Sequence, residues 1–261
     1  MKEKRIIYYS RTYRRIKVNK IKYILYICLL ILPALLFLWF HLDDLTRWMC
    51  EVSVQVLKKY CPEVRAGIRT ERYALFGNLS YLSARTVYPG FRTSVLNAVA
   101  SFFAIAVIVN LPWKGRPVAI YLLLNTGIHL INSLWFVFGE RYFPYSLTTY
   151  SELYMLQEIG IWIVFLVMTG LVTGMIGDRG FIYKFLAVAA VMAYSILFGV
   201  LRYMVFMYFM YRYSIIYMAL CYFTFGPMFD FLYLVMIYAI FVNRMIKIYD
   251  SGKGREAWRW S

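Results

Sequence analysis

The sequence predicts an all-α membrane protein, a polytopic transmembrane helical bundle of about six spans with a small extracytoplasmic cap. Composition is the first reason: 62% of the 261 residues are hydrophobic and only 16% are charged, against roughly 45–50% and about 25% in an average soluble domain. A series of long apolar runs and an uneven distribution of basic residues are the others. Because one globular core cannot hide so much apolar surface, much of it must face lipid.

Six apolar runs are long enough to cross the hydrocarbon core, which takes about 20 residues of helix. They are expected at 23–40, 93–111, 118–138, 154–176, 181–204 and 218–242. Gly226-Pro227 interrupts the last run, and proline breaks the hydrogen bonding of a helix interior. We therefore expect that run to be kinked, or to divide into a re-entrant piece and a short span.

These runs divide the chain into five parts. They are a basic cytoplasmic arm (1–22), a first transmembrane anchor (23–40), an extracytoplasmic segment (41–92), a five-span helical core (93–243) and a basic cytoplasmic tail (244–261). The first run reads as a signal anchor, since it follows a long basic arm and has no small-residue cleavage site.

The basic residues indicate the orientation. Nine of them lie in the first 22 positions, against the single acid Glu3. With six spans, 18 basic and 4 acidic residues fall on one face, and 11 basic and 9 acidic residues on the other. Basic residues concentrate on the cytoplasmic side of membrane proteins. We therefore expect a multi-pass protein of the cell (inner or plasma) membrane with both termini in the cytoplasm.

The formal charge of +16 is then explained by topology. Its expected partner is the lipid bilayer, including anionic lipids at the cytoplasmic surface. No nucleic-acid binding is expected.

The extracytoplasmic segment has two halves. Residues 43–60 have helical periodicity, so this half is expected to lie along the membrane surface. Residues 68–87 alternate and contain Gly77-Asn78, which predicts a hairpin or extended pair. About fifty residues cannot form a large core of their own, so we expect a cap on the bundle. Cys50 and Cys61 are candidates for a disulfide there.

Polar side chains inside the spans are the only chemical signal, because burying them in lipid is costly. The third span carries a stripe on one helical face: Asn125, His129, Asn132 and Ser133. At ~1.5 Å per residue, His129 lies near the midplane, as does Asp230 in the last span. The stripe is either a set of interhelical hydrogen bonds or a functional site.

Three ionisable residues are expected to find partners. Glu158 lies early in the fourth span and Arg202 late in the fifth, so both approach the outer face and an ion pair between them is predicted. Asp230 needs a partner too, for which His129 and Arg202 are the candidates. The pair Glu158–Arg202 is either a staple between helices or part of an outward-facing polar site that includes Tyr222.

Several kinds of chemistry have no motif here. The chain has no His-Glu-x-x-His, no Gly-x-Ser-x-Gly, no Gly-rich phosphate loop and no paired-cysteine metal site. No cofactor and no metal are therefore expected, and catalytic residues are unknown.

One stretch, 67–138, resembles the core of exosortases and archaeosortases. In that family a Cys-Ser-Gly-Leu-Arg-like turn opens a helix, a later helix carries an Arg, and a further helix opens with a His followed by Gly. In this register Thr86–Arg92 supplies the turn with Gly90 and Arg92, and Tyr88 stands at the position of the nucleophile. Asn125–His129 occupies the Arg region, and Leu156–Gly160 the third element without its His.

A second register of the same resemblance lies further along. Glu158–Gly160 is then the first element, Gly199–Arg202 the second and Tyr222–Gly226 the third. It keeps the Arg and the glycines, and Glu158 stands at the position of the nucleophile. Neither register keeps the cysteine or the histidine, so the cysteine transpeptidation of the family does not carry over, because a thiolate is not replaced by Tyr or Glu in that mechanism.

Three functions follow as hypotheses. The resemblance implies a divergent exosortase-like protein, catalytic or not, in sorting or export of cell-surface proteins or glycans, with an exported polypeptide or glycan as partner. The midplane His129 and Asp230 favour a small-solute or proton transporter. The aromatic faces favour a non-catalytic subunit of a membrane complex that packs against a partner's spans.

The topology generates a prediction. A cysteine introduced at Ser251 is expected to react with an impermeant thiol reagent only after the cells are opened, because the tail is cytoplasmic. Labelling in intact cells would refute the six-span arrangement.

Overall fold

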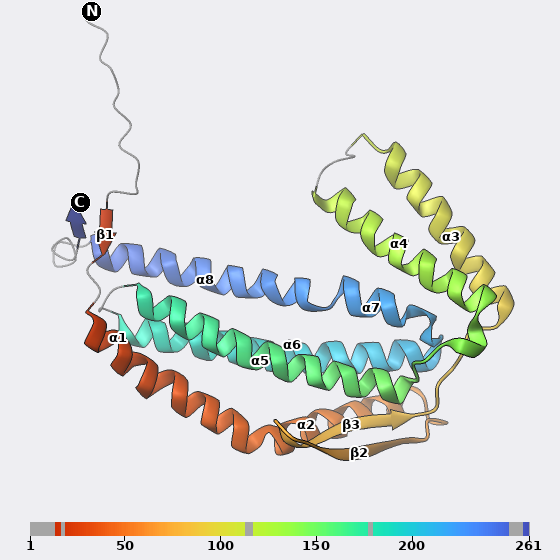
Figure 1. Cartoon of the computed structure of the whole chain (residues 1–261), viewed down its shortest axis with the longest axis horizontal. Helices are drawn as coiled ribbons and strands as arrows, with labels where there is room; N and C mark the ends of the chain where they lie inside the picture. The colour runs from red at the N-terminus through yellow and green to blue at the C-terminus, as the bar shows by residue number, and fades with distance from the viewer. Residues whose placement is uncertain (1–13, 17–18, 113–116, 177–179, 251–257, 261) are drawn as a thin grey trace, which may run out of the picture. The chain divides into compact units, whose positions relative to one another are not determined.

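The computed structural model describes residues 14–16, 19–112, 117–176, 180–250 and 258–260, and Figure 1 shows its elements in chain order. The first part of the chain gives β1 (Arg14–Ile16), α1 (Lys20–Tyr26), the π-helix η2 (Ile27–Ile31), α2 (Leu32–Tyr60), β2 (Ala66–Tyr73), β3 (Gly77–Ala84) and α3 (Phe91–Asn110). The remainder gives α4 (Pro117–Phe138), the 3-10 turn η3 (Glu140–Tyr142), α5 (Leu147–Met175), α6 (Phe181–Arg212), the 3-10 turn η4 (Ile215–Tyr217), α7 (Met218–Thr224), α8 (Pro227–Asp250) and β4 (Trp258–Trp260).

Six helical segments among the described residues are long and apolar enough to cross a membrane. The prediction of an all-α bundle with about six spans is confirmed, and the protein is an integral, multi-pass membrane protein. The helices are longer than the apolar runs: α5 begins at Leu147 rather than at residue 154. Its start is capped by Ser146, whose Oγ accepts from the N–H of Thr149 at 3.1 Å. Hydropathy locates only the part of a helix that lies in lipid.

The chain forms two compact units, and α5, α6 and α8 each contribute one part to either unit. The first unit comprises Met1–Phe37, Ile163–Ala193 and Tyr233–Ser261. The second comprises Leu38–Trp162 and Tyr194–Leu232.

In the first unit, the opening helix begins at Lys20 because Asn19 caps it, accepting from the N–H of Ile21 at 3.0 Å. The π-helical turn η2 lies directly before Pro33, which has no N–H for the carbonyl four residues earlier. The N–H of Leu32 reaches back five residues to the carbonyl of Ile27. The π turn thus adapts the helix to the missing donor without ending it.

Small residues on α5 bring that helix close to the first span. Gly170 lies against Ile31, and Gly174 lies against Tyr23 and Tyr26. The hydroxyl of Tyr26 is 2.9 Å from that of Thr173, so one hydrogen bond joins the helices where they approach. Such contacts are typical of helix pairs in lipid, where packing rather than water exclusion drives association.

The strands β1 and β4 pair in antiparallel fashion, with Arg14 opposite Trp260. The two ends of the described chain therefore lie side by side, which agrees with an even number of spans. That this side is the cytoplasm stays a prediction.

In the second unit, β2 and β3 form the expected hairpin, with Ala66 opposite Ala84 and Tyr73 opposite Gly77. Its turn lies at 74–76, one step before the predicted Gly77-Asn78. Gly77 has φ of +72°, a conformation that favours glycine, so it ends the turn and begins β3.

The helix of the outer segment is confirmed, but it is not a separate surface helix. The chain is helical without a break from Leu32 to Tyr60, since nothing near residue 40 breaks a helix. Cys50 and Cys61 are both free thiols, so the candidate disulfide is not formed. Cys50 is fully buried.

The inner strand β3 packs on helices. The backbone N–H of Ser80 donates to Thr46 of α2 at 3.3 Å, and that of Leu82 donates to Ser151 and Tyr203 at 2.9 and 3.0 Å. Side-chain hydroxyls thus satisfy strand donors that have no strand partner on that edge. The hairpin covers helices of its own unit, as a cap does.

A tyrosine of β3 also fastens the two strands to each other. The hydroxyl of Tyr81 donates to Glu71 at 2.6 Å. Burial, together with the nearby Glu71 carboxylate, raises the pKa of Tyr81 to about 12, so the phenol keeps its proton near neutral pH and the bond persists.

The close approach in the first unit generates a prediction. Gly174→Ala is expected to destabilise the protein by roughly 1–3 kcal/mol, because the new methyl group would lie 2.8 and 2.9 Å from the Tyr23 and Tyr26 rings. Gly160→Ala, in the same helix with nothing within 4 Å, is the control, and the higher helix propensity of alanine should make it neutral or stabilising. Thermal unfolding in detergent measures both, and equal effects would contradict the packing argument.

Candidate functional site

The buried charges of the second unit meet at one place. Glu158 of α5, Arg202 of α6 and Asp230 of α8 are 1%, 4% and 1% exposed. Arg202 Nη2 lies 2.5 Å from Glu158 Oε2, and Nη1 lies 2.9 Å from Asp230 Oδ2. The predicted ion pair Glu158–Arg202 is confirmed, and of the two candidate partners for Asp230 the structure selects Arg202.

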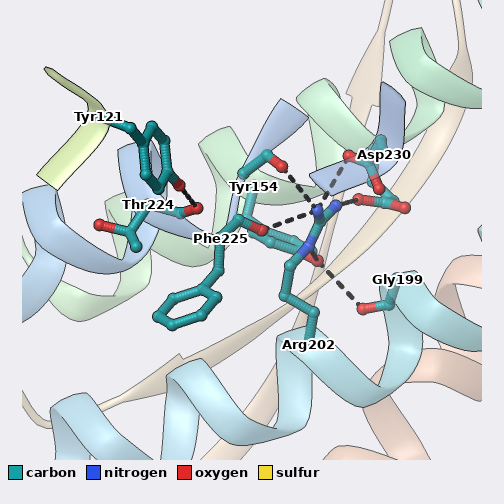
Figure 2. Close-up of polar contacts among 9 residues, drawn as sticks. Tyr121, Tyr154, Gly199, Arg202, Thr224, Phe225 and Asp230 are labelled. Atoms are coloured by element: carbon teal, nitrogen blue, oxygen red, sulfur yellow. Dashed lines mark hydrogen bonds and ion pairs between the residues drawn. The ribbon is translucent and has the colours of Figure 1, made fainter. Parts of the chain in front are cut away.

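Arg202 uses all three of its nitrogen atoms within the protein (Figure 2). Nε donates to the hydroxyl of Tyr154 at 2.7 Å. Nη1 also donates to the carbonyls of Phe225 and Gly226, at 2.9 and 3.3 Å. The planar guanidinium suits this fork of acceptors, which the single ammonium group of lysine does not match.

The two carbonyls come from the break in the last span. α7 ends at Thr224 and α8 begins at Pro227, so the predicted interruption at Gly226-Pro227 is confirmed. Carbonyls at a helix end have no partner within the helix, and in lipid each unsatisfied group costs several kcal/mol. Arg202 supplies a donor to the Phe225 carbonyl, and it also donates to the Gly226 carbonyl, which accepts from the N–H of Phe229 at 3.0 Å as well. The cluster and the break therefore support each other.

Gly199 makes room for the cluster. It lies about one turn before Arg202 on α6, and a Cβ there would meet Glu158 Oε1 and lie 2.7 Å from Glu158 Cδ. Its carbonyl accepts from the Tyr154 hydroxyl at 3.0 Å. Tyr154 therefore donates to α6 backbone and accepts from the Arg202 side chain. A larger residue at 199 would displace the carboxylate.

The cluster does not balance its charges by itself. Two carboxylates share one guanidinium, which leaves one negative charge in excess if both acids are ionised. Glu158 Oε1 is buried and has no hydrogen-bond partner among the described residues. A buried charge without compensation is costly, so the arrangement can bind a further positive charge or a proton.

An apolar pocket of about 360 Å³ lies beside the cluster, between α6 and α7. Its lining includes Leu201, Arg202, Val205, Cys221 and Phe225. Because the guanidinium nitrogens are bonded to the cluster, Arg202 offers the pocket little hydrogen-bonding capacity. Leu201 and Val205 are more than half exposed, so the pocket has a lipid-facing wall. It suits an apolar chain.

The polar stripe of α4 forms a second, separate network. Asn125 Oδ1 accepts from the Thr224 hydroxyl at 2.9 Å, and Asn132 Nδ2 donates to the Ile216 carbonyl at 2.5 Å. His129 Nε2 lies 3.2 Å from Asn97 Oδ1 of α3, and its ring stacks on Tyr217 with centroids 5.3 Å apart. The stripe thus holds α4 to α3, η4 and α7.

The other predicted site residues lie outside both networks. Arg92 is exposed near the start of α3. The ring of Tyr222 contacts Phe223, and no hydrogen bond joins Tyr222 to Arg202 among the described residues. Ser133 donates to the carbonyl of His129 at 2.8 Å, within its own helix.

Three tyrosines of these networks are not among the site residues that the sequence predicts: Tyr154, Tyr121 and Tyr217. The hydroxyl of Tyr121 donates to the Thr224 carbonyl (Figure 2), and that of Tyr217 donates to Asn97 Oδ1 at 3.1 Å. Tyr154 precedes Glu158 by four residues, a spacing that places both on one helical face. This spacing is a signal in the sequence that identifies Tyr154 as a neighbour of Glu158. The chain has 25 tyrosines, so the residue type alone does not single these out.

No family model, curated protein or solved structure matches this chain.

Arg202 yields a stability prediction. Arg202→Met is expected to lower the free energy of unfolding by about 3–5 kcal/mol, because the buried acids Glu158 and Asp230 lose their cation and the Phe225 carbonyl loses its donor. Arg212→Met, at the exposed end of the same helix, should change it by less than about 0.5 kcal/mol. Unfolding in detergent followed by tryptophan fluorescence compares them. Similar losses would show that the cluster does not stabilise the fold.

Proposed function

We propose that this protein is a divergent exosortase-like membrane protein that acts in the sorting or export of cell-surface proteins or glycans without cysteine chemistry. The observation that carries the proposal is the meeting of three segments. Glu158–Gly160, Gly199–Arg202 and Tyr222–Gly226 are the three elements of the second register of the resemblance. Arg202 bonds to Glu158 of the first and to the Phe225 and Gly226 carbonyls of the third.

The first register has no such support. Its Arg92 is exposed, and its Asn125 and His129 belong to the network that holds α4 in place. Spatial convergence therefore favours the second register, in which a carboxylate takes the position of the thiol.

A binding role agrees better with the cluster than catalysis does. Each nitrogen of Arg202 already bonds to an acceptor of the protein, so the cluster offers no open donor set for an oxyanion. Glu158 is 1% exposed, which excludes attack on a substrate in this state. The role left to the cluster is to hold α5, α6 and the broken span around the neighbouring pocket.

The pocket indicates what is bound. Its apolar lining and the exposed Leu201 and Val205 fit the membrane-embedded tail of an exported polypeptide, which presents an apolar surface to the bundle. Cargo that enters from the lipid phase needs no aqueous cleft. This is the substrate class that we propose.

The alternatives have weaker support. A transporter based on His129 and Asp230 would need the two side chains in one path, whereas His129 bonds to Asn97 and Asp230 to Arg202. A non-catalytic subunit of a membrane complex agrees with the exposed apolar faces of α3 and α4. It differs from the main proposal by having no exported cargo.

Deleting the gene tests the function. In the deletion strain, proteins with a C-terminal apolar segment followed by basic residues, or the surface glycans, are expected to be depleted from the cell surface and restored by the wild-type gene. An unchanged surface proteome and glycan profile would refute a role in sorting or export.

Site-specific photocrosslinking then tests the pocket. A photoreactive residue at 201 should crosslink to a depleted protein identified by the deletion, whereas one at Leu197, exposed on the same helix but outside the pocket lining, should not. Equal capture at both positions would argue against the pocket as the cargo site.

The absence of cysteine chemistry is a prediction of its own. A variant with Cys28, Cys50, Cys61 and Cys221 replaced by Ala is expected to restore the surface phenotype fully at normal expression. Cys221 is the decisive position because it lines the pocket beside Arg202. Loss of function that the return of Cys221 alone reverses would establish a thiol mechanism.

A further inference from the structure

The charged side chains that the described residues place around Arg202 come from three helices. Glu158 and Tyr154 come from α5, Arg202 from α6 and Asp230 from α8. α7 contributes Cys221 nearby, and the break after it contributes two neutral carbonyls. Tyr150 is the other buried phenol of α5 in this region. With both acids ionised and the phenols neutral, the cluster would carry one net negative charge.

A net charge at this place would be unusually costly. The three charged side chains are at most 4% exposed, so water does not screen them. A single proton on one of the two acids would leave one ion pair and no net charge.

Position in the helices indicates which acid carries the proton. Asp230 lies in the first turn of α8, where the helix dipole favours the ionised form, whereas Glu158 lies in the interior of α5. Glu158 Oε2 bonds to Arg202, and its Oε1 is buried without a hydrogen-bond partner among the described residues. A carboxylate oxygen that is charged, buried and unbonded is unfavourable, whereas a neutral carboxyl group leaves a smaller deficit. Protonation of Glu158 therefore removes a buried charge with an unbonded oxygen, and this gain offsets the loss of its ion pair with Arg202.

A metal ion does not fit the same space. Glu158 Oε1 is packed so closely on Gly199 that a methyl group there would collide with the carboxyl. A cation such as Na⁺ or Ca²⁺ needs several oxygen ligands around it. Among the described residues no group of three or more His, Cys, Asp or Glu could hold a metal ion. A proton needs no additional volume.

We propose that the Glu158–Arg202–Asp230 cluster is a binding site for one exchangeable proton, held on Glu158 in the folded protein. The site is independent of the proposed sorting function, since it rests on burial, charge and packing alone. Its neutral form keeps the broken span bound to α6, and loss of the proton leaves the cluster with an uncompensated charge.

Linkage gives the sign of the pH dependence. Near neutral pH the folded protein would hold one more proton than the unfolded chain, in which Glu158 is ionised in water. The free energy of unfolding then falls as pH rises, since stability increases with pH only where the unfolded state binds more protons. Carboxylates that form simple ion pairs in folded proteins give the opposite slope.

The experiment uses the full chain in lipid nanodiscs, with thermal unfolding measured from mildly acidic to mildly alkaline pH. The wild-type midpoint is expected to fall as pH rises. Glu158→Gln, which mimics the protonated acid, is expected to keep the wild-type midpoint at acidic pH and to remove the slope. Asp230→Asn should also remove the pH dependence of the midpoint, but its midpoint should be lower than that of the wild type, because the variant loses the Asp230–Arg202 ion pair. The double variant should be the least stable, because Arg202 then has no counter-charge.

Glu140→Gln is the matched control, since Glu140 is exposed in η3, and it should keep the wild-type slope. Infrared spectroscopy gives a readout that does not depend on variant stability. The wild type should show the carbonyl band of a protonated carboxylic acid near neutral pH, and both Glu158→Gln and Asp230→Asn should lose it.

Three outcomes would overturn the proposal. One is a wild-type midpoint that does not fall with pH, together with no protonated carboxyl band. Another is loss of the fold in Glu158→Gln to the extent seen in Arg202→Met, which would mean that Glu158 acts as a carboxylate. The third is a midpoint raised by Na⁺ but not by choline at equal ionic strength, which would identify a metal ion as the occupant.

Discussion

The guanidinium group of Arg202 is the interaction on which the arrangement of the second unit depends. It is a permanent cation at a buried position, and it can be there only because acceptors from three directions surround it. Glu158 approaches from α5 and Asp230 from α8, while the carbonyls of Phe225 and Gly226 come from the break between α7 and α8. Each group would be expensive in lipid alone.

The cluster lies at a helix break because Arg202 and the backbone at the break stabilise each other. A continuous last span would satisfy its own carbonyls and would offer Arg202 only side chains. The interruption at Gly226-Pro227 makes the Phe225 and Gly226 carbonyls accessible to Arg202. Arg202 needs neutral acceptors in addition to carboxylates, because its five N–H groups must be satisfied. Gly199 has no side chain, so the Glu158 carboxyl can approach α6. The rings of Tyr154 and Phe198 lie near the guanidinium carbon, at 5.4 and 5.5 Å, and add a weaker attraction.

Features that depend on composition along the chain are predictable from the sequence. The spans followed from hydropathy, the break from Gly226-Pro227 and the pair Glu158–Arg202 from matched depth in antiparallel helices. The partner of Asp230 stayed open between His129 and Arg202, because a helix that is apolar on most sides gives no information about its rotation in lipid. The role of the Phe225 and Gly226 carbonyls is not predictable from the sequence, since every residue has a carbonyl and only the fold decides which of them meet a side-chain donor.

Helix continuity and register were the other points where the sequence was insufficient. The helix from Leu32 to Tyr60 was expected to divide near residue 40, where the composition changes from apolar to charged. A change in composition marks a change of surroundings, whereas a helix ends only where its hydrogen bonding is interrupted. The hairpin turn shows the same limit: Gly77 was recognised as a turn residue, but its place at the end of the turn depends on the strand pairing.

The short helix α7 connects the two polar networks, and both of them hold its C-terminal end. On one side Asn125 and Tyr121 of α4 bind Thr224, the last residue of α7. On the other side Arg202 of α6 binds the next two carbonyls along the chain. Seven residues of helix are too short to be stable alone, so α7 holds its position through neighbours at the end where it stops. Because the pocket wall includes Cys221 of α7 and Leu201 of α6, the shape of the pocket depends on the same bonds. The charge state of the cluster and the geometry of the pocket are therefore linked through three consecutive residues, Thr224, Phe225 and Gly226.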